Sequence, residues 1–270
     1  MAEEILLRER KGNVGTLILN RPDKLNSMSV ELLLELIKAV NECAADDTIR
    51  CLVITGAGDK AFCAGFDIKS IPTNFSAKDA QSLEAKAIRA NMPIEQLMNS
   101  LKNYPYPTIA MLNGLTIGAG FNLAMCCDIR IAADTVLMGI PPAKLGLVYF
   151  PGGIKQVAEA LGMARAREVF FTGRIYGPEE VRRMGLAHQM VPAAELSNTT
   201  YRLAEEISEN APLSLKGIKK ILNMLEAQTA LTETGQKEAE LLMAQAFMSE
   251  DLKEGQLAFL QRRKPQFKGR

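Results

Sequence analysis

Short apolar runs rich in β-branched residues recur through the first two thirds of the chain. Val14 to Asn20, Ile49 to Thr55, Pro107 to Leu112 and Asp128 to Ala133 have the length and composition of buried strands. After the first of these, Ser29 can cap a helix whose apolar residues recur at helical spacing. Apolar strands joined by helices are typical of a parallel sheet covered by helices. The sequence therefore predicts an α/β core.

The pattern changes near residue 195. Four helical segments then follow one another with short breaks, namely Leu196 to Glu209, Leu213 to Leu225, Leu231 to Met248 and Leu252 to Phe259. We therefore divide the chain into an α/β core over residues 1–195, which would hold the site, and a helical domain over residues 196–270. The stretch from Asn74 to Tyr106 is more polar, and we expect it to form a loop and a helix beside a site.

Composition excludes several classes of function. The 270 residues carry a net charge of +1, which gives no reason to expect binding to nucleic acid or to a membrane. No segment reaches the ~18 apolar residues of a membrane span, and the first residues do not look like a signal or transit peptide. The five cysteines include no Cys-x-x-Cys pair, so we expect reduced thiols in a cytoplasmic protein. With His188 as the single histidine, we expect no metal site and a structural role for this residue.

Two glycine-rich turns each follow an apolar run and lead toward a helix. The first is Ala61 to Lys69 (AFCAGFDIK) and the second is Asn113 to Asn122 (NGLTIGAGFN). Small residues let a ligand approach the backbone closely, and amides at a helix N-terminus stabilise a negative oxygen. If the turns converge, they can form an oxyanion hole. Glycines that serve only tight turns and helix packing would give the same spacing. Neither turn matches a P-loop or a dinucleotide fingerprint.

The two turns belong to a longer, ordered set of motifs. The others are Asn20 to Asn26 (NRPDKLN), Cys127 to Ala133 (CDIRIAA), Leu145 to Leu147 (LGL), Phe171 to Arg174 (FTGR) and Ala258 to Pro265 (AFLQRRKP). In this order they resemble the enoyl-CoA hydratase/isomerase (crotonase) superfamily over nearly the whole chain. The resemblance implies a spiral of ββα units with a C-terminal helical oligomerisation domain. It also implies acyl-CoA substrates, no cofactor beyond the CoA moiety, and a homotrimer or homohexamer.

The resemblance assigns roles by position. The backbone N–H groups of Phe66 and Ala119 would form the oxyanion hole for the thioester carbonyl. Phe259 and Arg262, from a neighbouring subunit, would close over the adenine and phosphate end of CoA, where a cation suits the phosphate charge. The remaining CoA contacts would come from Lys24, Leu25, Ala64, Phe66, Asp67, Ile68, Lys69 and Gly118.

The chain departs from the family at the acidic positions. Hydratases of this family use two glutamates, and Asn122 and Pro142 stand at those positions here. Addition of water to a conjugated double bond needs a base and an acid, which neither residue supplies. Tyr149 falls where the methylmalonyl-CoA decarboxylases of this superfamily carry a tyrosine, and those enzymes also have proline at the position of Pro142. They differ in having histidine at the position of Phe66 and glutamate at that of Asn122.

Decarboxylation of a malonyl-type thioester is the reaction that these residues favour, because loss of CO2 itself generates the enolate. Asn122 and Tyr149 are then the candidate catalytic side chains. Alternatively, Asn122 only bonds the start of a helix and Tyr149 is only a core aromatic. Three other functions stay open: a hydratase or isomerase that uses a different acid, a thioester hydrolase that uses Glu84 or Glu95, and a scaffold that binds acyl-CoA without catalysis.

Overall fold

The computed structural model describes residues 4–66, 93–227 and 233–267. Its largest element is a six-stranded sheet whose strands follow one another across the sheet in chain order. The strands are parallel except for the antiparallel pair at one edge, β1 and β2. They are β1 (Leu6–Lys11), β2 (Val14–Leu19), β3 (Cys51–Gly56), β5 (Thr108–Leu112), β7 (Ile129–Ala133) and β10 (Gln189–Val191).

A second, four-stranded sheet lies beside the first. It consists of β4 (Ala61–Cys63), β6 (Leu115–Ile117), β8 (Met138–Gly139) and β9 (Ile175–Tyr176). Strands β3, β5 and β7 of the large sheet are each followed in the chain by one strand of the small sheet, namely β4, β6 and β8. A helix comes after each pair, so the chain advances as successive ββα units. The predicted spiral is confirmed.

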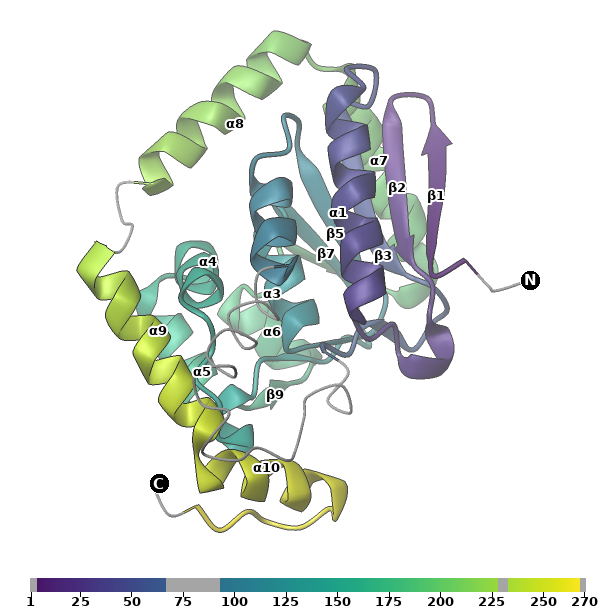
Figure 1. Ribbon diagram of the computed structural model, residues 1–270. Helices are drawn as coiled ribbons and strands as arrows, with labels where there is room; N and C mark the ends of the chain where they lie inside the picture. The colour runs from purple at the N-terminus through teal and green to yellow at the C-terminus, as the bar shows by residue number, and fades with distance from the viewer. Residues whose placement is uncertain (1–3, 67–92, 228–232, 268–270) are drawn as a thin grey trace.

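Helices cover both faces of the large sheet (Figure 1). On one face, α7 packs against β2, β3, β5 and β7. The larger core lies on the other face. Ser29 caps the helix after β2 as expected, since its side chain accepts a hydrogen bond from Leu32 N. From the start of the described chain to residue 209, the helices are α1 (Val30–Ala45), residues 93–102, α3 (Ala119–Cys126), α4 (Pro151–Leu161), α5 (Met163–Thr172), α6 (Pro178–Met184) and α7 (Leu196–Glu209). Short 3-10 turns occupy η1 (Pro22–Lys24), η4 (Pro142–Leu145) and η5 (Ala193–Glu195).

The tail is helical, as the sequence predicts. It continues with α8 (Pro212–Ala227), α9 (Glu233–Met248) and α10 (Glu250–Leu260), and α8 reaches outward from the body (Figure 1). Buried Lys219 ties α8 to the sheet by donating to Asp128 Oδ2 at 2.7 Å and to Tyr106 O at 3.0 Å. Since α7 packs on the sheet itself, the division of the chain at residue 195 stays a prediction.

Three smaller expectations concern the cysteines, His188 and membrane spans. All five cysteines are free, and burial raises the pKa of Cys51, Cys63 and Cys127 to about 12. His188 has the expected structural role, because its Nδ1 accepts a hydrogen bond from the backbone N–H of Arg130. None of the helices in the described ranges is long and apolar enough to cross a membrane.

Candidate active site

The two glycine-rich turns converge. Gly65 and Gly118 adopt φ values of +94° and +57°, a region that favours glycine. A Cβ built on Gly65 would lie 2.9 Å from Ile117 O and 3.4 Å from Ala119 N. A side chain at position 65 would therefore collide with the second turn. The close approach of the two backbones explains why the first turn carries a glycine here.

The two candidate oxyanion donors, the N–H groups of Phe66 and Ala119, lie where the two turns touch. Ala119 is the first residue of α3, whose N-cap Gly118 has no side chain to cap the first amides. Phe66 directly follows Gly65 and pairs with Met28 in an isolated β-bridge. Met28 N donates to Gly65 O at 2.8 Å, which fixes the first turn. The start of a helix also carries a partial positive charge, which favours a negative oxygen at this place.

The loop with the first predicted CoA contacts packs against the same turn. Leu25 O accepts a hydrogen bond from Ala64 N at 3.0 Å, and Leu25 has a left-handed backbone with φ of 51°. Buried Asn26 holds the loop by donating to Ala57 O and Ala61 O. Lys24 is exposed on the same loop. The structure thus brings together Lys24, Leu25, Ala64, Phe66 and Gly118, whereas Asp67, Ile68 and Lys69 lie outside the described residues.

Asn122 and Tyr149 meet at Gly153. A Cβ built on Gly153 would lie 2.5 Å from Asn122 Oδ1 and 2.4 Å from Tyr149 Cε1. The Asn122 amide donates to Gln156 Oε1 at 2.9 Å and to Cys126 Sγ at 3.7 Å. Its Oδ1 and the Tyr149 hydroxyl are both buried, and neither has a hydrogen-bond partner among the described residues. Two unpaired buried polar atoms are costly, so a bound molecule that paired with them would be stabilised.

The acidity of Tyr149 is suppressed. Burial raises the pKa of its hydroxyl well above the ordinary value, and Cys126 and Cys63 add to the effect. The ring packs against Phe150 and Phe170, with centroids 4.6 Å and 5.8 Å away. Tyr149 therefore keeps its proton near neutral pH and can act as a hydrogen-bond donor.

The second acidic position of the family holds no acid. Pro142 is buried at the start of η4. Glu84, one of the two acids considered for hydrolysis, lies outside the described residues. The other, Glu95, is half-buried beside the first turn of α4, where its Oε1 lies 3.2 Å from a Cβ built on Gly152. Burial and the nearby Glu240 carboxylate raise the pKa of Glu95 above its ordinary value.

The C-terminal residues stand apart from this cluster. Phe259 is 58% exposed near the end of α10, and Arg262 follows with φ of +52°. Helix α10 packs on η4 of the same chain, where a Cβ built on Gly255 would lie 2.6 Å from Leu145 O. The contribution of Phe259 and Arg262 to a neighbouring subunit's site stays a prediction.

A charged cavity of about 500 Å³ lies at the C-terminal ends of α3 and α4, away from the glycine turns. Its charged lining is paired internally: Lys102 bonds Glu159 and lies 2.9 Å from Glu226, and Lys219 bonds Asp128. Within residues 4–66, 93–227 and 233–267, no group of three or more His, Cys, Asp and Glu side chains is arranged to hold a metal ion.

The family model for enoyl-CoA hydratase/isomerase matches residues 9–270. The chain belongs to this family. The short-chain-enoyl-CoA hydratase of Clostridium acetobutylicum is 31% identical over 262 residues, covering 96% of this chain and 95% of that protein. The crotonyl-CoA hydratase of Syntrophomonas wolfei is 33% identical over 267 residues, 99% of each chain. A solved structure of methylmalonyl-CoA decarboxylase in complex with 2-nitronate-propionyl-CoA matches with a TM-score of 0.87 and 27% identity, covering 100% of both chains.

Membership in the enoyl-CoA hydratase/isomerase family confirms the crotonase-like fold and an acyl-CoA enzyme. Sequence reasoning did not identify Gln156 or Gly153 as neighbours of Asn122. The one sequence signal for this contact is the Gly152-Gly153 pair at the start of α4, and such a pair is more typical of a loop. Its contacts with Asn122 and Tyr149 come from distant segments, so no local pattern encodes them.

Proposed function

We propose that this protein decarboxylates a malonyl-type CoA thioester through an enolate held in a backbone oxyanion hole. The observation that carries the proposal is the group formed by Gly65, Ala119, Asn122 and Tyr149. Amide donors at converging turns stand close to two side chains that do not act as bases at neutral pH. Such a site suits a reaction that creates negative charge on oxygen without removing a proton first.

The N–H groups of Phe66 and Ala119 would donate to the thioester oxygen. As the bond between the α-carbon and the carboxylate breaks, its electron pair forms the enolate and CO2 leaves. Each oxyanion donor of this kind contributes on the order of 3 kcal/mol to the stability of the transition state. The apolar side chains of Phe66, Phe150 and Ile140 would favour a neutral product over a carboxylate.

The roles of Asn122 and Tyr149 follow from their hydrogen bonds. Both N–H groups of the Asn122 amide face acceptors, Gln156 Oε1 and Cys126 Sγ, so Oδ1 is the atom left unpaired and would face the substrate. An acceptor repels a carboxylate and favours its departure. The Tyr149 hydroxyl retains its proton, and it would orient the carboxylate before that group leaves.

The residues that would hold the CoA moiety are Lys24, Leu25, Ala64, Phe66, Asp67, Ile68, Lys69 and Gly118, and Phe259 and Arg262 would close over it. It would be the only cofactor-like group in the reaction. We further propose a cytoplasmic homotrimer or homohexamer. The exposed apolar residues of α8 support this assembly, because they would be covered in an oligomer: Leu213, Ile218, Ile221, Leu222, Met224 and Leu225.

The match to the methylmalonyl-CoA decarboxylase structure extends over the full length of both chains, and it supports decarboxylation. One rival has a specific observation in its favour. Relatives of similar identity are named hydratases, and Glu95, whose pKa is raised, stands near the site. A hydratase or isomerase that uses Glu95 as its acid is therefore the second candidate.

The test is incubation of the pure protein with a CoA-thioester panel that includes methylmalonyl-CoA and crotonyl-CoA, read by mass spectrometry. We expect CO2 loss from methylmalonyl-CoA, slowed about tenfold or more in Tyr149→Phe, which keeps the ring and removes the donor. Asn122→Ala serves as the second site variant. Rapid gain of water by crotonyl-CoA would overturn the proposal in favour of the hydratase. No turnover of any thioester would favour a scaffold that binds acyl-CoA.

A further inference from the structure

Three helices run in the same direction beside the glycine turns, and this places a further residue at the site. On the helix over residues 93–102, Glu95 lies against Gly152 of α4, 3.2 Å from a Cβ built there. Lys102 follows Glu95 by seven residues, and it bonds Glu159, which follows Gly152 of α4 by the same number. Two contacts with the same spacing on each helix mean that the helices are parallel and start at the same end.

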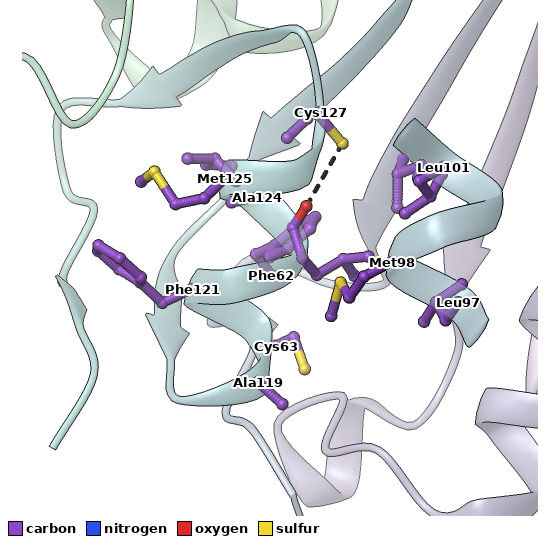
Figure 2. Close-up of a cluster of buried hydrophobic side chains, with 14 of the residues drawn as sticks. Phe62, Cys63, Leu97, Met98, Leu101, Ala119, Phe121, Ala124, Met125 and Cys127 are labelled. Atoms are coloured by element: carbon purple, nitrogen blue, oxygen red, sulfur yellow. Dashed lines mark hydrogen bonds between the residues drawn. The ribbon is translucent and has the colours of Figure 1, made fainter. Parts of the chain in front are cut away.

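Helix α3 shares this direction. Figure 2 shows Leu97 on the side of Ala119, at the start of α3, and Leu101 on the side of Cys127, just beyond its end. Along α4, Asn122 of α3 contacts Gly153 and Gln156, near the start of that helix. The first turns of α3 and α4 and the Glu95 end of the third helix therefore meet at the oxyanion turns. The charged cavity lies at the opposite end.

Glu95 differs from the other acids of this region. Glu159 is held by Lys102 and Lys155 at the far end of α4. Glu95, in contrast, is half-buried and has neither an ion pair nor a hydrogen bond to any residue that the structure describes. Its neighbour in α4, Gly152, directly precedes Gly153, the glycine that contacts both Asn122 and Tyr149.

The proposed reaction lacks a proton carrier. Once CO2 has left, the α-carbon must take up a proton, and neither Asn122 nor Pro142 can supply one. Tyr149 would have to become a buried phenolate to do so, which the strong rise in its pKa opposes. Resting on the enolate chemistry proposed above, we propose that Glu95 is the catalytic acid–base that carries the proton to and from the α-carbon. In the forward direction, the Glu95 carboxyl O–H bond breaks and a C–H bond forms. The enolate electron pair becomes that bond, the thioester C=O is restored, and solvent reprotonates the carboxylate.

The surroundings of Glu95 suit this role. Uncharged Gly152, in the first turn of α4, lies against the Glu95 carboxylate, and α9 presents Glu240. Burial and this second carboxylate both raise the pKa of Glu95, so a larger share of the group carries a proton near neutral pH. Removal of the Glu240 charge is expected to lower that pKa.

The test is exchange of the α-hydrogens of propionyl-CoA in D2O, read by mass spectrometry. Exchange is the reverse of enolate protonation, so it reports on Glu95 whether or not the protein decarboxylates anything. We expect exchange by the unmodified protein and a loss of about a hundredfold in Glu95→Gln. Glu209→Gln, an exposed acid at the end of α7, is the matched control and should exchange normally. Glu240→Gln should move the pH at which exchange becomes fast to a lower value.

Exchange by Glu95→Gln at the unmodified rate would overturn the proposal, as would absence of exchange by the unmodified protein. The melting temperature of Glu95→Gln, measured alongside, should be no lower than that of Glu209→Gln, because removal of a half-buried charge does not destabilise the fold. Lost exchange is then not lost folding. Methylmalonyl-CoA is assayed separately with the same proteins. Exchange that depends on Glu95 without any CO2 loss would retain Glu95 as the acid–base and reject decarboxylation, so the two failures are distinguishable.

Discussion

Replacement of Gly153 by alanine tests whether the contact between α4, Asn122 and Tyr149 is as tight as the structure indicates. The added Cβ would lie 2.4 Å from Tyr149 Cε1, 2.5 Å from Asn122 Oδ1 and 2.7 Å from Phe150 Cζ. No real carbon tolerates three such contacts, so the rings and the amide must shift. Asn122 is restrained by Gln156, and Tyr149 is packed between Phe150 and Phe170. We therefore expect the strain to persist.

The size of the effect follows from two opposing contributions. Insertion of a methyl group into a packed interior costs about 1–3 kcal/mol. Alanine is a better helix former than glycine by up to ~1 kcal/mol, which offsets part of this cost. A net loss of about 1–2 kcal/mol lowers the melting temperature by roughly 2–8 °C in a domain of this size. A displacement of about 1 Å at the reacting groups lowers kcat about a hundredfold.

Thermal unfolding checks the expected fall in melting temperature, and the rate of CO2 loss from methylmalonyl-CoA checks the expected fall in kcat. Gly217→Ala in α8 is the matched control, since a Cβ built there meets nothing within 4 Å. The control should gain up to ~1 kcal/mol and keep its activity. A Gly153→Ala variant with unchanged stability and unchanged turnover would refute the reasoning, because it would show that Asn122 and Tyr149 do not meet at this glycine.

Two predictions concern stability. Burial and Arg130 lower the pKa of His188 below its ordinary 6.5, so the folded state favours neutral histidine. This contribution to the free energy of unfolding is complete above pH 6.5 and is lost as the pH falls through the lowered pKa of the folded state, and it is small because His188 is exposed. Melting curves from pH 5 to 8 should show this loss, and His188→Gln should abolish it. Lys219→Met removes the donor to Tyr106 O and one of three donors to Asp128 Oδ2, which keeps those from Thr108 N and Thr108 Oγ1. Because the Asp128 side chain is 36% exposed, water compensates in part, and we expect urea denaturation to show a loss of about 1–3 kcal/mol; an unchanged midpoint would contradict the role of this pair in holding α8.

The fold could be predicted where each element carries its own pattern. The apolar runs that gave β2, β3, β5 and β7 are buried on both faces, so their composition alone marks them as strands. The left-handed glycines at 65 and 118 were likewise visible as turns. Their convergence was expected only as one of two outcomes, because a turn's sequence does not state which backbone will lie against it.

What the sequence could not provide depends on contacts between distant segments. Gln156 restrains Asn122 through a bond between α4 and α3, and Glu95 reaches the first turn of α4 only because three helices are parallel. The helices from α4 to α6 also went unrecognised, since glycine and proline at their starts resemble loop residues. Proline is favoured in the first turn of a helix, and Pro151 and Pro178 both occupy that place.

A competition experiment tests the central claim most directly. Equal amounts of methylmalonyl-CoA and crotonyl-CoA are mixed with the protein in one tube, and the masses of both thioesters are followed over time. The account predicts that methylmalonyl-CoA loses CO2 while crotonyl-CoA stays unchanged. Hydration needs both a base for the water and an acid for the α-carbon, and Glu95 is one group, while Asn122 and Pro142 supply neither. Preferential conversion of crotonyl-CoA to its hydrated product would contradict the account and would identify the protein as a hydratase with a displaced acid.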